Sequence, residues 1–95
     1  MIVRMNAKSH EAIVCDRLME SAENRKRFGA STITLYHEGE ALKAYGQQAM
    51  DLANAIGAHT TMDGGIHYLE FEYYKRDMHY PRLVKKGYKV CIIDI

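Results

Sequence analysis

Cysteine, long apolar runs and any strong excess of one charge are all scarce in this chain of 95 residues. Its two cysteines, Cys15 and Cys91, form no CxxC motif and no metal-spaced pair with histidine, so we expect free, buried thiols in a reducing compartment. No apolar run approaches the roughly 20 residues that a membrane-spanning helix needs. The apolar stretch within residues 1–6 is too short for a secretory signal. We therefore expect a soluble, cytoplasmic protein with no membrane partner.

The charge is nearly balanced, because 13 basic residues against 12 acidic residues give a formal net charge of +1. A dedicated nucleic-acid-binding protein usually carries a larger basic excess, so the overall charge argues neither for nor against DNA binding. Local clusters would have to supply any attraction to phosphate. The Arg25-Lys26-Arg27 run and the Lys85-Lys86-Lys89 group are such clusters, although basic residues at helix ends have a structural role first.

No pattern in the sequence predicts catalysis or a cofactor. A phosphate-binding GxxxxGK[ST] loop and a GxGxxG dinucleotide loop are both absent, so the chain has no nucleotide site of its own. His37 and Glu38, with Glu40, could serve acid–base chemistry at a strand exit, but solvated turn charges are far more common. The histidines are too scattered to predict a metal site; they are His10, His37, His59, His67 and His79. We expect no enzyme activity, no metal and no cofactor.

Helical periodicity of apolar residues occurs in three segments of the chain. Residues 9–28 form the first predicted helix, with Ser9 as its candidate N-cap. A second apolar stripe predicts a helix over about residues 40–56, with Gly46 inside it at a cost of about 1 kcal/mol relative to alanine. The third predicted helix covers about residues 77–86.

Strand patterns fill the remaining segments. Residues 31–36 alternate apolar and polar side chains, and residues 59–62 and 66–74 flank the hairpin signal Asp63-Gly64-Gly65. Residues 88–93 are apolar on both faces, which predicts a central strand covered by helices on both sides. The chain length allows one domain, residues 1–95, so we predict an α/β fold with a small mixed β-sheet flanked by helices.

Aromatic side chains are dense in the second half of the chain. Bases could stack on them while Lys75 and Arg76 hold phosphates, but the buried face of a strand is the commoner role for such residues. The aromatic residues concerned are Tyr68, Phe71, Tyr73, Tyr74 and Tyr80.

Two segments together resemble a known family. The stretch Leu35-Tyr36-His37-Glu38-Gly39-Glu40, with the segment carrying Tyr45 and Ala49, is similar to the opening of the N-terminal mismatch-recognition domain (domain I) of the MutS DNA mismatch-repair proteins. In that family an aromatic strand end leads into Gly-Asp-Phe-Tyr-Glu. Residues 80–92 resemble the family's closing helix, Gly-Tyr pair and strand, and the whole similarity spans roughly residues 31–94.

The resemblance implies a mixed sheet flanked by helices and contact with duplex DNA at a mispair. In the family a phenylalanine wedges beside the mismatched base from the minor groove, and a glutamate two residues later hydrogen-bonds that base. The corresponding positions here are Ala41, which has no ring to stack, and Lys43, which inverts the charge. Lys43 could pair with a phosphate, but it cannot replace the glutamate.

Two functions remain open at this stage. The first is a stand-alone, DNA-associated module like MutS domain I, an accessory of DNA processing such as mismatch repair, with His37 and Lys43 as its main DNA-contact candidates and Arg25 and Lys26 as secondary ones. The alternative is a protein–protein interaction or regulatory module that reuses the fold without DNA. Its surface would be the aromatic strand and the exposed part of the third helix.

Overall fold

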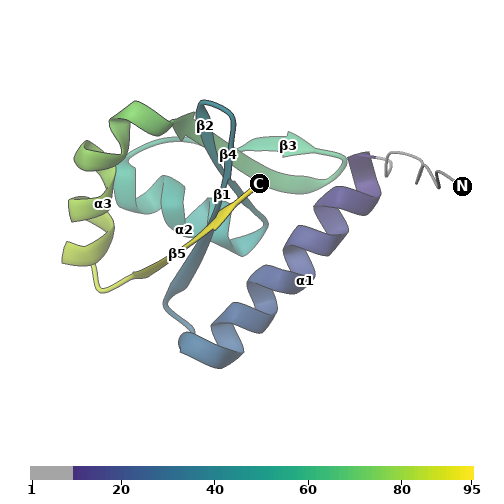
Figure 1. Cartoon of the computed structure of the whole chain (residues 1–95), viewed down its shortest axis with the longest axis horizontal. Coiled ribbons are helices and arrows are strands. Elements are labelled where there is room, and N and C mark those ends of the chain that lie inside the picture. Colours follow the sequence, from purple (N-terminus) through teal and green to yellow (C-terminus); the bar gives the residue numbers. More distant parts are fainter. Residues whose placement is uncertain (1–9) are drawn as a thin grey trace, which may run out of the picture.

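Five strands form one mixed sheet with helices packed on both of its faces, as the sequence predicts (Figure 1). The structure, a computed structural model, describes residues 10–95, so the proposed cap Ser9 lies outside the described residues. The elements are α1 (His10–Phe28), β1 (Thr32–Glu38), β2 (Ala41–Tyr45), α2 (Gln47–Ile56), β3 (Thr61–Asp63), β4 (Ile66–Glu72), the 3-10 turn η1 (Tyr73–Lys75), α3 (Arg76–Lys85) and β5 (Lys89–Asp94).

The sheet has the strand order β3-β4-β2-β1-β5. β1 and β2 form an antiparallel hairpin, β4 pairs antiparallel with β2, and β3 pairs antiparallel with β4. β5 lies beside β1 and parallel to it. The expected hairpin around Asp63-Gly64-Gly65 is therefore confirmed, although β3 is only three residues long.

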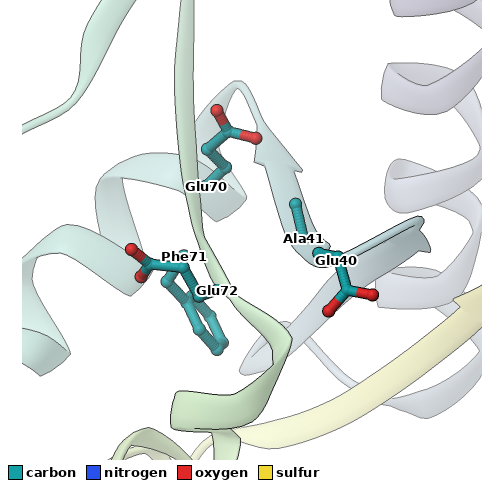
Figure 2. A pocket seen from close by; sticks show the side chains of 5 residues that line it. All are labelled: Glu40, Ala41, Glu70, Phe71 and Glu72. Atoms are coloured by element: carbon teal, nitrogen blue, oxygen red, sulfur yellow. The ribbon is translucent and has the colours of Figure 1, made fainter.

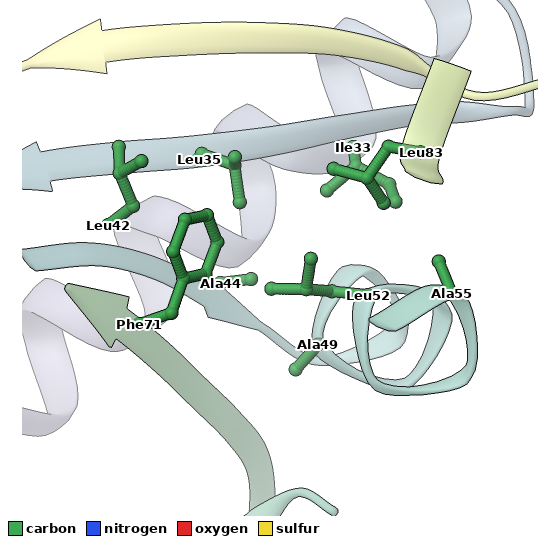
Figure 3. Close-up of a cluster of buried hydrophobic side chains, with 9 residues drawn as sticks. All are labelled: Ile33, Leu35, Leu42, Ala44, Ala49, Leu52, Ala55, Phe71 and Leu83. Carbon is green, nitrogen blue, oxygen red and sulfur yellow. The ribbon is translucent and has the colours of Figure 1, made fainter. Parts of the chain in front are cut away.

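Side chains that alternate along the strands build two separate apolar layers. Ile33 and Leu35 of β1 point toward α2 and α3, where the main core is fully buried (Figure 3). Tyr36 points to the opposite face and packs with Tyr45 and Val14 beneath α1. The members of the main core are Ile33, Leu35, Leu42, Ala44, Ala49, Leu52, Ala55, Phe71 and Leu83. Helices thus cover both faces of β1, which is the most deeply buried strand.

The sequence prediction for residues 41–45 was wrong. This segment is β2 and not the start of a helix, because Leu42 and Ala44 are buried at a spacing of two residues. The helix begins only after Gly46, whose φ of 66° belongs to the left-handed region that favours glycine. A Cβ atom built at Gly46 would also lie 2.5 Å from Cδ2 of Leu18. Gly46 therefore separates the strand from the helix and lets α1 pack closely.

Two further expectations were wrong. β5 lies at an edge of the sheet and not at its centre, so Ile92 keeps 41% of its surface exposed. The two cysteines are free, as expected, but Cys15 is exposed on α1 and Cys91 is only half-buried. Both errors have one cause: an apolar sequence does not reveal which face or edge a neighbouring element leaves uncovered.

Candidate nucleic-acid interface

The β1–β2 hairpin carries the positions where the resemblance places the mismatch reader. Ala41 lies opposite Glu38 on one neighbouring strand and opposite Glu72 on the other. Lys43 lies opposite Glu70. Because residues that face each other across paired strands point to the same side of a sheet, Ala41 and Lys43 share their face with these glutamates.

A hollow of about 320 Å³ opens beside Ala41 (Figure 2). Its lining includes Phe71 and three carboxylate side chains, those of Glu40, Glu70 and Glu72. Where the family presents an aromatic wedge, this chain thus has a small alanine side chain among acidic groups. A carboxylate-lined hollow repels the phosphates of a DNA backbone, so this face is electrostatically unsuited to holding a duplex.

Lys43 does not offset this acidity, because it is already engaged within the chain. Its Nζ atom lies 3.4 Å from Oε2 of Glu38, and Nη2 of Arg17 donates to the same oxygen at 2.8 Å. The hydrogen bond from Arg17 lowers the pKa of the Glu38 carboxyl from its ordinary value, and the charge of Lys43 adds to this effect. Arg17 also donates to the hydroxyl of Tyr45 at 2.7 Å. This network attaches α1 to the hairpin.

His37 points to the other face of the sheet, away from Lys43. Its ring stacks on Tyr73 with centroids 3.8 Å apart and planes 8° apart, and its Nδ1 atom lies 2.8 Å from Oδ1 of Asp94. The guanidinium of Arg76 lies over the ring of Tyr73, 4.1 Å from the ring centroid. His37 therefore belongs to a local stack that joins β1 to η1 and β5.

Arg25 and Lys26 lie in the last turns of α1. Arg25 donates from Nε to Oε1 of Gln48 at 2.8 Å and forms an ion pair with Asp51, so it joins α1 to α2. Lys26 is exposed, and its side chain forms no ion pair or hydrogen bond with the residues that the structure describes. The residues predicted to contact DNA are thus not gathered in one place: Lys43 and His37 lie on opposite faces near the hairpin, while Arg25 and Lys26 lie at the end of α1.

A different set of basic residues does come together. The ends of α1 and α3 and the start of β5 lie at the same end of the molecule, away from the β1–β2 turn (Figure 1). Nζ of Lys89 donates to the carbonyl oxygen of Phe28 at 3.0 Å, which joins β5 directly to the end of α1. We call the exposed basic residues here the basic end; they are Lys26, Arg27, Lys85, Lys86 and Lys89.

Part of this basic end stabilises the fold. Nζ of Lys86 donates to the carbonyl oxygen of Asn54 at 3.2 Å, and Nη1 of Arg82 donates to that of Ile56 at 3.3 Å. Both carbonyls lie in the last turns of α2, where cationic side chains stabilise a helix. Lys85 lies between Arg82 and Lys86 in the sequence; it is exposed and within residues 10–95 forms no ion pair. Lys26 and Lys85 are thus the cations most available to a ligand.

The sequence indicated the two basic clusters but not their meeting. It gave no sign that Glu70 and Glu72 face Lys43 and Ala41, because that contact depends on the register between β2 and β4.

The aromatic residues are mostly used inside the fold: Phe71 is buried and Tyr73 is stacked. Tyr74 is 68% exposed, so it is the aromatic ring of this group that a base could reach.

No family model and no curated protein sequence matches the chain. Within residues 10–95 the structure contains no group of three or more histidine, cysteine, aspartate or glutamate side chains that could hold a metal ion. In the same range, no helix combines the length and apolar character needed to cross a membrane.

Proposed function

We propose that the chain is a module related to the mismatch-recognition domain of MutS, and that it contacts the phosphates of duplex DNA through its basic end. The observation that carries this proposal is the meeting of lysines and arginines from α1, α3 and β5 at one end of the molecule. The resemblance over residues 31–94 supports the DNA association. The near-neutral net charge does not oppose it, because phosphate contact depends on local clusters of basic residues.

The basic end is suited to phosphate and not to base reading. Lys26, Lys85 and Lys89 are exposed, and long lysine side chains bind phosphate oxygens without regard to sequence. About four phosphate contacts would reduce affinity on the order of 100-fold between about 50 mM and 200 mM salt. A single small domain with this footprint binds weakly and depends on salt.

Mismatch reading by the family mechanism does not belong to this proposal. Ala41 offers no ring to insert between base pairs, and the hollow beside it is lined by Glu40, Glu70 and Glu72. A duplex approaching this face would meet carboxylates at the place where a wedge should enter. The chain therefore binds matched and mismatched duplexes with similar affinity.

A titration of labelled matched duplex, mismatched duplex and single-stranded DNA at about 50 mM and 200 mM salt tests both statements. We expect equal affinity for the two duplexes and a steep loss of binding as salt rises. Tighter binding to the mismatched duplex would show that Ala41 and Lys43 do not disable mismatch reading. Absence of binding at low salt would show that the chain does not bind DNA.

A protein-interaction module is the second candidate, favoured by exposed apolar side chains on and before α3. Tyr74 is 68% exposed and Met78 50% exposed, and their four-residue separation places them on neighbouring turns. Val84, farther along α3, is 65% exposed. If no DNA is bound at low salt, this surface becomes the better candidate, and a Met78→Lys variant would weaken association with the partner.

A further inference from the structure

β5 leaves one side of its backbone free. The amides of Lys89 and Ile95 donate to carbonyl oxygens before and at the end of β1, on Ser31 and His37, each at 2.9 Å. Because amides along a strand alternate in direction, the amides of odd-numbered residues point to β1 and those of Val90, Ile92 and Asp94 point outward. No strand pairs with the outer side of β5 anywhere in residues 10–95.

The free edge is long and apolar. β3, at the opposite edge of the sheet, has three residues, whereas β5 has six and carries Val90-Cys91-Ile92-Ile93 at its centre. Ile92 is 41% exposed and the adjoining Ile95 is 65% exposed. A long apolar edge with unpaired amides and carbonyls is a template for a strand from another chain.

The charges along this edge identify the strand that fits. β5 starts at the basic end with Lys89 and finishes with Asp94, whose side chain is 83% exposed. Asp16 and Glu20 of α1, together with Arg17, line a hollow of about 230 Å³ beside Ile93 near this finish, and Arg17 is paired with Glu38. Lys89 projects from the same face of β5 as Cys91 and Ile93, the face that α1 covers. A second copy of β5 that runs antiparallel therefore brings the Lys89 of each copy toward Asp16 and Glu20 of the other.

We propose that a second copy of this chain pairs with β5 antiparallel, so that one sheet continues through both copies. A two-fold axis at Ile92 sets Ile92 opposite itself and Val90 opposite Asp94 of the second copy. In this register every outward amide and carbonyl of the three outward residues finds a partner. An axis at Cys91 or at Ile93 leaves one outward residue of each copy unpaired, so the axis at Ile92 is favoured.

Side chains at the join are compatible with this register. On the α1 face, Cys91 lies opposite Ile93 of the second copy, and on the other face the exposed Ile92 side chains meet. Phe28, 45% exposed, and Lys89 line a hollow of about 220 Å³ at the start of β5. In the antiparallel arrangement this hollow lies toward the hollow beside Ile93 of the other copy, which Asp16, Arg17 and Glu20 line. Apolar side chains thus meet along the edge, while Lys89 of each copy lies toward Asp16 and Glu20 of the other.

Sedimentation equilibrium of the full chain over a wide concentration range tests the proposal. We expect a reversible dimer, weakened about tenfold or more by Ile92→Lys and by Ile92→Glu, because each sets like charges opposite one another at the axis. An equal mixture of the two variants regains the dimer, since lysine then faces glutamate. Met62→Lys, at the opposite edge on β3, is the control and leaves dimerisation unchanged, while circular dichroism verifies that each variant is folded.

Cross-linking tests the register. With Cys15 replaced by serine, Ile93→Cys places its thiol opposite Cys91 of the second copy, where the spacing of paired strands permits a disulfide. We expect covalent dimers from this variant and none from the Cys15→Ser chain alone. Dimers from Cys15→Ser alone would move the axis to Cys91 and overturn the proposed register. A wild-type chain that stays monomeric at every concentration would overturn the dimer and leave the edge to a different partner.

Discussion

Lys43 and Glu38 are diagonal neighbours across the β1–β2 hairpin, with Nζ of Lys43 3.4 Å from Oε2 of Glu38. Lys43 stands at the position where the resemblance would place a base-reading glutamate. The lysine is one member of a network that also contains Arg17, and Glu70 lies opposite it on β4. The charge inversion at this position therefore serves the packing of α1 and the hairpin. It does not create a free cation for DNA.

Lys43→Glu should lower the stability of the fold more than the affinity for DNA. The new carboxylate would lie beside Glu38 and Glu70, and like charges on paired strands destabilise by roughly 1 kcal/mol. DNA affinity, measured on folded protein, should change less than twofold. A loss of DNA affinity as large as that caused by Lys26→Glu would show that the hairpin is part of the DNA-binding surface.

The ion pair of Arg17 and Glu38 makes stability depend on pH. The pKa of the Glu38 carboxyl is lowered in the folded state, chiefly by the hydrogen bond from Arg17, so its contribution is present above the ordinary value of 4.5 and is lost as the pH falls through the folded-state value. At neutral pH, Glu38→Gln should cost up to about 1 kcal/mol, because the carboxylate is partly exposed. Urea unfolding at several pH values should show this cost vanish in acid; a cost that grows in acid would contradict the argument.

Gly46→Ala should be strongly destabilising. The residue has a φ of 66°, and the added Cβ would lie 2.5 Å from Cδ2 of Leu18, so we expect a loss of about 2–4 kcal/mol in the free energy of unfolding. Gly39→Ala is the comparison, because Gly39 also has a positive φ, of 61°, but no atom within 4 Å of the added Cβ. That substitution should cost only about 1 kcal/mol. Equal costs in urea unfolding would mean that contact with Leu18 has no part in the effect.

Local sequence signals predicted most of the elements. The Asp63-Gly64-Gly65 hairpin depends on backbone conformations that glycine adopts readily. Residues 41–45 failed because Leu42, Tyr45 and Ala49 fit a helical stripe as well as they fit a strand followed by a helix. The edge position of β5 depends on strand order, which is set by contacts between distant segments.

The candidate site was predictable only in part. The Arg25-Lys26-Arg27 and Lys85-Lys86-Lys89 clusters are visible in the sequence, but their meeting requires the parallel pairing of β5 with β1. Similarly, the resemblance drew attention to Ala41 and Lys43, while the acidic surroundings of both follow from the register of β4. Local sequence patterns do not predict which residues of different strands lie next to each other, because strand order and register decide this.

The basic end is tested most directly by reversing charges there and elsewhere in matched variants. Lys26→Glu combined with Lys85→Glu changes two exposed cations at the basic end. The control combines Lys75→Glu with Lys43→Glu, which makes the same change in net charge near the hairpin and η1. Circular dichroism verifies that both double variants are folded.

The deciding measurement is the affinity of these two double variants for matched duplex DNA as a function of salt. Binding through the basic end predicts that the Lys26/Lys85 variant loses affinity on the order of 10-fold or more at about 50 mM salt and that its salt dependence becomes shallower by about two phosphate contacts. The control should bind as the wild-type chain does. Equal losses in both variants, or an unchanged salt slope in the Lys26/Lys85 variant, would contradict the account.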